Sequence, residues 1–184
     1  MPYCRKMVNQ IANEIEKCIE NECFLGALTM ALTLPDVCGK AMDPSEKSSK
    51  KRYIKWFDTY IGNGQRVPEP YGKNMPYTSG ELLYSLRCFM LHQGSPAIDS
   101  SEIQEERCKV DHFKLVISNS GISSSANVSH GINYEITSRS LNVNVAMLCD
   151  IIAETAKYYY EENRERFDFL RCELLDVRDD EETE

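Results

Sequence analysis

The sequence predicts a mainly α protein, a bundle of about five helices with a β-hairpin inserted before the last long helix. Three observations lead to this fold class. Most of the chain repeats apolar residues at helical spacing, one region switches to strict alternation, and 184 residues with 42% hydrophobic content suit one globular domain. We therefore expect one domain over residues 1–175, with the hairpin near 109–138, and a disordered acidic tail over 176–184.

The predicted helices differ in how much of their surface is apolar. Residues 4–20 place Met7, Ile11 and Ile15 on one face, which is typical of an amphipathic helix. The next run is apolar almost all round, so we expect it at the centre of the bundle, ended by Pro35 or restarted there as a short turn. The remaining helices are predicted at about 51–61, over 82–91 and from about 142 onward. The second of these, over 82–91, follows Thr78-Ser79-Gly80-Glu81, which has the spacing of a capping box.

Two segments alternate apolar and polar residues, as strands do. Val110 to Ser118 places Phe113, Leu115 and Ile117 on one face, and the segment Ile132 to Ile136 alternates likewise. We expect these segments to pair as a hairpin or small sheet. The stretch between them, 118–131, is rich in Ser, Asn and Gly, and we expect a mobile loop.

The charge of the chain is unevenly distributed. The formal net charge is −8, and residues 176–184 alone hold six acids and one base. The segment from Lys40 to Lys73 has eight bases and four acids instead. Within it, a cluster of four bases is a candidate contact for the phosphate backbone of RNA, although a solvated helix face explains it equally. These four residues are Lys50, Lys51, Arg52 and Lys55. Overall acidity argues against non-specific coating of nucleic acid.

The cysteines and the N-terminus indicate a reduced, cytoplasmic protein. None of the eight cysteines has CxxC spacing, and most lie in apolar stretches. Free buried thiols are therefore expected, with no metal and no cofactor. No apolar run approaches the roughly 20 residues of a membrane span. The first residues contain no apolar core of a signal peptide, which favours the cytoplasm.

The segment Leu82 to His92 contains the one informative group of residues. Arg87 is the only formally charged residue between Glu81 and Asp99, and its helical neighbours at i−4 and i+4 are Leu83 and Leu91. A covered guanidinium needs compensation from a carboxylate, a partner chain or an anionic ligand. His92 follows five residues later, so the two side chains start about 140° apart around the helix. They converge only if the helix loosens before Gly94 or if a second subunit supplies one of them.

Arg87-Cys88-Phe89-Met90-Leu91-His92 resembles the pattern of Arg, four to six residues and His that marks the HEPN superfamily. The resemblance covers one helix. It implies a small helical bundle, commonly a homodimer, and often a metal-independent ribonuclease of toxin–antitoxin or other defence systems. His92 would then be the general acid or base, and Arg87 would stabilise charge on the phosphoryl group. The sequence departs from active members at Cys88, where a polar residue is common, and at Gly94, where some have Tyr.

Other roles for the same residues remain open. Arg87 could pair with an acid inside the protein while His92 caps its helix end. In that case the helical body would be a non-enzymatic interaction protein that binds another protein, with the Ser-rich loop or the acidic tail giving specificity. The third hypothesis is a sensor protein, in which Arg87 pairs with an anionic small molecule. A ribonuclease requires Arg87 and His92 to converge in a cleft, whereas a structural role requires Arg87 against a specific carboxylate.

Overall fold

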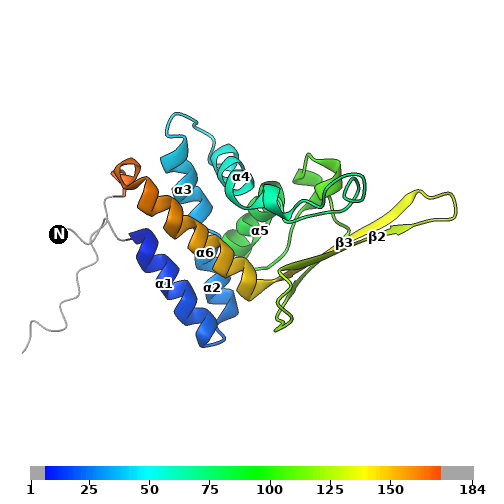
Figure 1. The fold of residues 1–184 in the computed structure, drawn as a ribbon, viewed down its shortest axis with the longest axis horizontal. Helices are drawn as coiled ribbons and strands as arrows, with labels where there is room; N and C mark the ends of the chain where they lie inside the picture. The colour runs from blue at the N-terminus through cyan, green and yellow to red at the C-terminus, as the bar shows by residue number, and fades with distance from the viewer. Residues whose placement is uncertain (1–6, 171–184) are drawn as a thin grey trace, which may run out of the picture.

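The computed structural model describes residues 7–170, and in them six α-helices form one body from which a three-stranded sheet projects (Figure 1). The mainly α prediction is confirmed. None of the helices in the described residues is long and apolar enough to cross a membrane. The α-helices are α1 (Met7–Glu20), α2 (Phe24–Ala31), α3 (Leu34–Met42), α4 (Ser49–Tyr60), α5 (Gly80–Gln93) and α6 (Val145–Glu162). The strands are β1 (His112–Val116), β2 (Ser124–His130) and β3 (Ile136–Asn144).

The helices pack around α6, which contacts α1, α2 and α3. α4 lies against α3, and α5 packs chiefly on α4. The core contains the fully buried side chains of Tyr53, Trp56 and Phe57 from α4, together with aliphatic residues of every other helix. α5 is therefore the outermost helix of the bundle, held mainly through α4.

The sixth helix arises where the sequence predicts only a turn. The apolar run 23–34 does not form one helix, because α2 ends at Ala31 and α3 starts at Leu34. Pro35 lies in the first turn of α3, where its missing N–H is not needed. α3 then continues to Met42 through residues that the sequence places partly in a loop.

Two glycines allow α4 to approach its neighbours closely. A Cβ on Gly39 of α3 would lie 2.6 Å from the carbonyl oxygen of Arg52. A Cβ on Gly80, the first residue of α5, would lie 2.8 Å from the backbone of Ile54. Real Cβ atoms do not approach backbone this closely, so both helix contacts depend on glycine.

The sheet has the order β1-β3-β2, with β1 parallel and β2 antiparallel to β3. The predicted segment Val110–Ser118 does enter a small sheet, as one of the two expectations has it, but its predicted pairing with the segment at 132–136 as a hairpin is wrong. The hairpin is formed by β2 and β3, and it does lie immediately before the last long helix, since Asn144 caps α6. β1 adds to the other edge of β3.

β2 occupies residues that the sequence assigns to a mobile loop. Its sequence is Ser-Ser-Ala-Asn-Val-Ser-His, in which only Ala126 and Val128 are apolar. Serine and asparagine have low strand propensity, so no local pattern identifies this strand. Its pairing with β3 supplies what the local sequence lacks.

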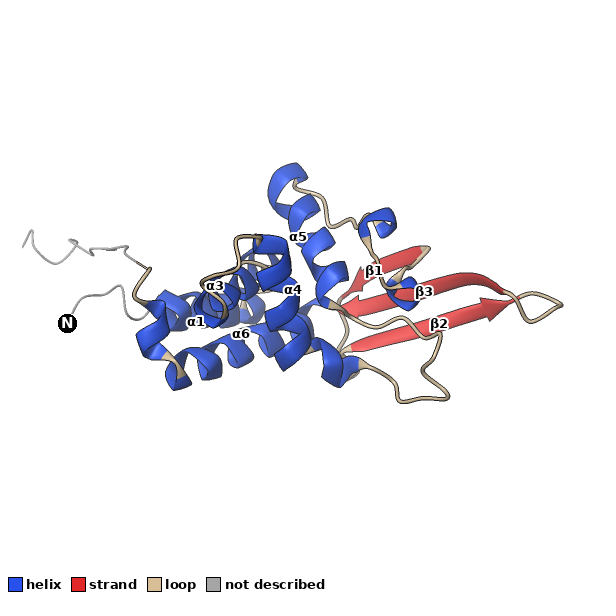
Figure 2. Cartoon of the chain, turned by 90° about the horizontal axis from the view of Figure 1, so that it is seen from above, coloured by secondary structure: helices blue, strands red, loops and turns tan. Residues whose placement is uncertain are grey.

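The hairpin extends well beyond the helices (Figures 1 and 2). Only the base of the sheet joins the core, through Leu141 and Val143, which are buried. Phe113, Leu115 and Ala126 pack against the same cluster. The outer half of the hairpin has no buried residue.

Some predicted features lie outside the described residues. The acidic tail 176–184 and the end of the predicted domain at residue 175 are among them, as are Cys4 and Cys172. Within the described part, α6 ends at Glu162 and a 3-10 turn, Arg164–Phe167, follows it.

The cysteines of the described part are free thiols, as expected, and they differ in reactivity. Cys38, Cys108 and Cys149 are buried, whereas Cys23 is exposed. Burial raises the pKa of Cys108 and of Cys149 to about 12, so both stay protonated near neutral pH. We predict that iodoacetamide labels Cys23 in the native protein and labels Cys108 and Cys149 only after unfolding. Peptide mass spectrometry measures this order, and early labelling of Cys149 would contradict the packing described.

Candidate functional site

Arg87 forms an ion pair with Asp36, through its Nη2 and a carboxylate oxygen. Asp36 lies in the first turn of α3, where the helix dipole favours a negative charge. The two side chains are only 21% and 20% exposed. The pair therefore links α5 to α3 across a partly buried gap, and a carboxylate from another helix supplies the compensation that the sequence requires for Arg87.

The surroundings of the ion pair are partly buried and offer few hydrogen-bond partners. Burial raises the pKa of Asp36 above its ordinary value, although Arg87 opposes this shift. The Nε of Arg87 and the hydroxyl of Tyr53 are both buried, and neither has a hydrogen-bond partner among the described residues. Loss of either charge would leave the other in a place that solvates it poorly.

Tyr84 supports the guanidinium from the preceding turn of α5. The Cζ of Arg87 lies 5.6 Å from the centre of the Tyr84 ring, a distance at which a cation is attracted to an aromatic face. The Nζ of Lys50 lies 5.9 Å from the same ring centre. Tyr53 meets this ring edge-on, with 5.4 Å between ring centres. Arg87 is thus held by a carboxylate and an aromatic ring of its own chain.

His92 has a different environment from Arg87. It is exposed in the last turn of α5, and its side chain makes no hydrogen bond or ion pair with the described residues. It does not cap the helix, because Gly94 adopts a left-handed conformation there with φ of 63°. The backbone N–H groups of Gly94 and Ser95 satisfy the last carbonyl groups.

Arg87 and His92 do not form one site within a single chain. α5 remains α-helical to Gln93, so it does not loosen between the two residues. Their directions stay about 140° apart around the helix. The guanidinium is directed toward α3, whereas His92 is open to solvent. Joint action of the two residues would require a second copy of the chain.

Tyr84, the ring near Arg87, also lines a cavity of about 230 Å³, which neither member of the ion pair lines. The charged lining residues are Lys50, Glu81, Asp99 and Glu102, so acids outnumber bases by three to one. Lys50 is itself paired with Glu102 at 3.5 Å. This charge balance disfavours a phosphate group in the cavity. Among residues 7–170, no group of His, Cys, Asp and Glu could hold a metal ion.

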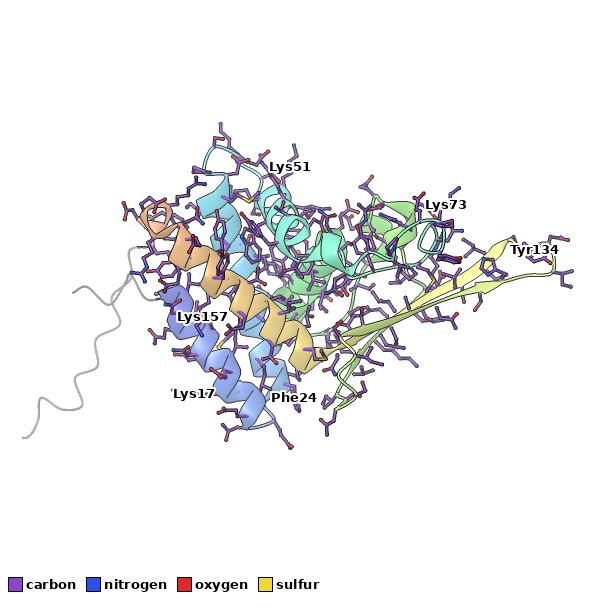
Figure 3. The ribbon with its side chains drawn as sticks, in the orientation of Figure 1. Lys17, Phe24, Lys51, Lys73, Tyr134 and Lys157 are labelled. Atoms are coloured by element: carbon purple, nitrogen blue, oxygen red, sulfur yellow. The ribbon has the colours of Figure 1, made fainter. Side chains whose placement is uncertain are left out.

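The four bases proposed as RNA contacts lie in the first two turns of α4. Lys50 pairs with Glu102, and Lys55 pairs with Asp43 at 2.8 Å. The guanidinium of Arg52 donates to the backbone carbonyl of Glu46. Lys51 is exposed and lies on the outer side of the body (Figure 3). Three of the four bases are therefore already engaged within the chain.

The start of α5 differs in detail from the predicted capping box. Ser79 rather than Thr78 is the N-cap, and its hydroxyl accepts from the N–H of Leu82 at 3.3 Å. The Glu81 carboxylate accepts from two backbone N–H groups of the segment 104–105 instead of reaching back to the cap. Asp58 of α4 accepts from the N–H of Gly80 at 2.7 Å, which anchors the first turn.

The sheet presents a second candidate surface, at the end of the molecule away from the helices. The hairpin tip exposes Ile132 at 97% and Tyr134 at 87%, and Tyr134 is at the far end of the projection (Figure 3). β2 pairs on one side only, because the sheet order is β1-β3-β2. The strand-forming backbone groups on its outer side thus have no strand partner within residues 7–170.

Sequence reasoning missed Asp36, Tyr84 and β2. Asp36 could have been suspected, because it directly follows the first Pro after an apolar run and so begins a helix next to the core. Tyr84 stands three residues before Arg87, a spacing that places both on one helix face. No signal in the sequence identifies the outer edge of β2.

Comparison of the chain with known protein families, with curated proteins and with solved structures finds no match. Any assignment of function therefore depends on the residues and contacts described above.

The two residues of the Arg–His pattern should differ sharply in their effect on stability. Arg87→Met leaves Asp36 partly buried without its partner, so we expect the free energy of unfolding to fall by about 2 to 4 kcal/mol. His92→Ala removes an exposed side chain that has no hydrogen bond or ion pair with residues 7–170, and it should leave stability close to that of the wild type. Urea unfolding followed by circular dichroism measures both. Equal stability of the two variants would contradict the structural role of Arg87.

Proposed function

We propose that this protein is a non-catalytic binding protein that uses its projecting sheet to hold another protein chain. The observation that carries this proposal is the β2–β3 hairpin, which extends beyond the helical body and leaves the outer edge of β2 unpaired within the described residues (Figure 2). Unpaired strand edges are templates for pairing with another chain.

The hairpin tip supports the proposal because its apolar side chains are not packed against the rest of the described chain. Ile132 and Tyr134 are 97% and 87% exposed. Tyr134 also adopts φ of 61°, a left-handed conformation that bulky residues rarely adopt and that glycine or asparagine would tolerate more easily. An exposed aromatic residue in a strained position is expected where a contact with a partner repays its cost.

The small size of the sheet also supports the proposal that it binds another chain. Three strands need a hydrophobic face or a packed helix to be stable, and only the base of this sheet packs against the core. None of the outer strand residues 127–130 and 136–140 is fully buried by the described chain, and Asn127, Ser129 and His130 of β2 are exposed. A partner lying along the hairpin would supply the missing cover.

The ion pair of Arg87 also agrees with a non-catalytic binding protein. A ribonuclease of the type suggested by the sequence needs the guanidinium for a phosphoryl group, whereas here it contacts Asp36 and the Tyr84 ring. α5 then serves to complete a rigid body that carries the sheet.

We expect that changing the hairpin tip removes partner binding. Immobilised wild-type protein and an Ile132→Ser, Tyr134→Ser variant would be incubated with an extract of the source cells, and the captured proteins quantified by mass spectrometry. The variant should lose specific proteins because it lacks the exposed apolar contacts.

A matched control comes from exposed aromatic residues elsewhere in the chain. Tyr71 and Tyr158 are 87% and 69% exposed, and neither belongs to the sheet. A Tyr71→Ser, Tyr158→Ser variant should capture the same proteins as the wild type. If all three proteins capture the same set, the hairpin is not the binding element and the proposal is wrong.

A ribonuclease of HEPN type, acting in a defence or toxin–antitoxin setting, is the second candidate function. The observation that favours it is the surface position of the helix that bears the motif. No residue from Arg87 to Gln93 is buried, and Leu91 is 36% exposed. An apolar, exposed end of α5 could contact the same helix of a second copy, so that Arg87 and His92 of two chains face one RNA.

The ribonuclease is tested by RNA cleavage in EDTA. This function predicts products with 2′,3′-cyclic phosphate ends from the wild type and their loss in His92→Ala, which removes the general acid or base. Arg87→Lys keeps a positive charge near Asp36 and so serves as the variant that preserves folding, yet it lacks the bidentate geometry for phosphate. Wild-type protein without cleavage, or equal cleavage by all three proteins, would exclude this function.

A further inference from the structure

We propose that the chain bound by the sheet is a second copy of this protein, paired antiparallel to β2 so that two three-stranded sheets become one of six strands. This inference rests on the proposed function, since it names the partner. It follows from the charge of the edge strands, the register that a two-fold axis imposes and the position of two exposed isoleucines.

β2 lacks the features by which proteins usually protect an edge strand from pairing. Protected edges carry lysine or other charges, proline, or a bulge. β2 is seven residues long and contains no Lys, Arg, Asp, Glu or Pro. The one irregularity of the hairpin, between Ser129 and His130, adds Thr137 to β3 and leaves β2 regular. The opposite edge is shorter, with five residues, and carries Lys114. The pairing edge is therefore β2.

A neutral edge favours a second copy over a partner of opposite charge. The chain has a net charge of −8, so two copies repel each other wherever their bodies come close. Antiparallel pairing along β2 places each hairpin tip beside the base of the other sheet. The helical bodies then lie at opposite ends of the combined sheet, because each body is at the base of its own hairpin (Figure 1). This arrangement keeps the acidic bodies apart.

Symmetry restricts the register of such a pair. Directly opposed residues of an antiparallel ladder point to the same face, and side chains alternate faces along a strand. In a pair with a two-fold axis perpendicular to the sheet, one residue must therefore oppose itself. Pairing over the whole of Ser124–His130 makes that residue Asn127, the middle of β2.

The register centred on Asn127 brings exposed apolar residues of the two copies to the same ends of the paired strands. It sets Ser125 opposite Ser129 and Ser124 opposite His130 of the second copy. Ile122 stands two residues before β2, and Ile132 stands two residues after it, in the hairpin turn. These isoleucines are 58% and 97% exposed in the single chain. The symmetric register therefore places Ile122 of one copy and Ile132 of the other beside the same end of the pairing, where contact between them would remove apolar surface from water.

The first test is the mass of the purified protein in solution. Light scattering coupled to size-exclusion chromatography should show a mass that rises with concentration toward twice the 21.1 kDa of one chain. A Ser125→Lys, Ser129→Lys variant should remain at the mass of one chain, because the pairing sets each new lysine opposite another. His112→Lys places a lysine at an exposed position of β1 instead and should dimerise like the wild type.

The second test fixes the register. Cα atoms of directly opposed residues are about 4.5 to 5.5 Å apart, within the range that a disulfide requires. Asn127→Cys should therefore give a covalent dimer under mild oxidation. Ser125→Cys sets its thiol opposite residue 129 rather than another thiol, and should give no more dimer than the wild type, whose exposed Cys23 provides the background.

Each outcome decides the proposal. A mass of one chain at every concentration, a dimer that persists in the double lysine variant, or Asn127→Cys that cross-links no better than Ser125→Cys would overturn it. Those results would leave the capture experiment to decide the broader function, because a protein other than a second copy could still be lost from the tip variant. A different combination is also informative. If the protein forms dimers of the predicted register and the tip variant still captures every protein, the sheet binds only a second copy of this chain.

Discussion

The ion pair between Arg87 and Asp36 is the interaction on which the rest of the structure depends. It lies between the outermost helix and the first turn of α3, and its two side chains are 21% and 20% exposed. A charge in such a place is tolerated only with its partner. Tyr84 and Tyr53 pack around the pair, so it holds the middle of α5, while the close approach at Gly80 holds the start of the same helix on α4.

The helical body and the sheet differ in how far their interacting groups have partners within the chain. In the helical body, the charged groups nearest α5 have partners within the chain: Arg87 with Asp36, Lys50 with Glu102 and Lys55 with Asp43. The sheet has the opposite character, with an unprotected strand edge and an apolar tip. In the function that we propose, the helical body carries the sheet and the sheet is the binding surface. The exposed His92 remains the feature of the body that this division does not explain.

The sequence allowed the helices to be located but not the contacts between them. Periodicity located the helices of the body well, since the pattern of apolar residues directly reflects the buried face. The boundary at Leu32–Thr33 and the helix α3 were missed, because an apolar run does not reveal where it bends. The need for a partner to Arg87 was predictable from its uncharged surroundings, whereas Asp36 stands 51 positions earlier and only the packing of α3 and α5 selects it. β2 was not predictable, because a strand of Ser and Asn acquires its structure from β3.

A double-mutant cycle on Arg87 and Asp36 tests this account most directly. Urea unfolding of the wild type, Arg87→Met, Asp36→Leu and the double variant gives the coupling free energy between the two side chains. We predict a coupling of about 1 to 3 kcal/mol, with the double variant more stable than Arg87→Met, because it removes both members of the pair and leaves neither charge without the other. Additive effects, within about 0.5 kcal/mol, would show that the pair does not hold α5. They would favour instead the role in binding a phosphoryl group that the spacing of Arg87 and His92 suggests.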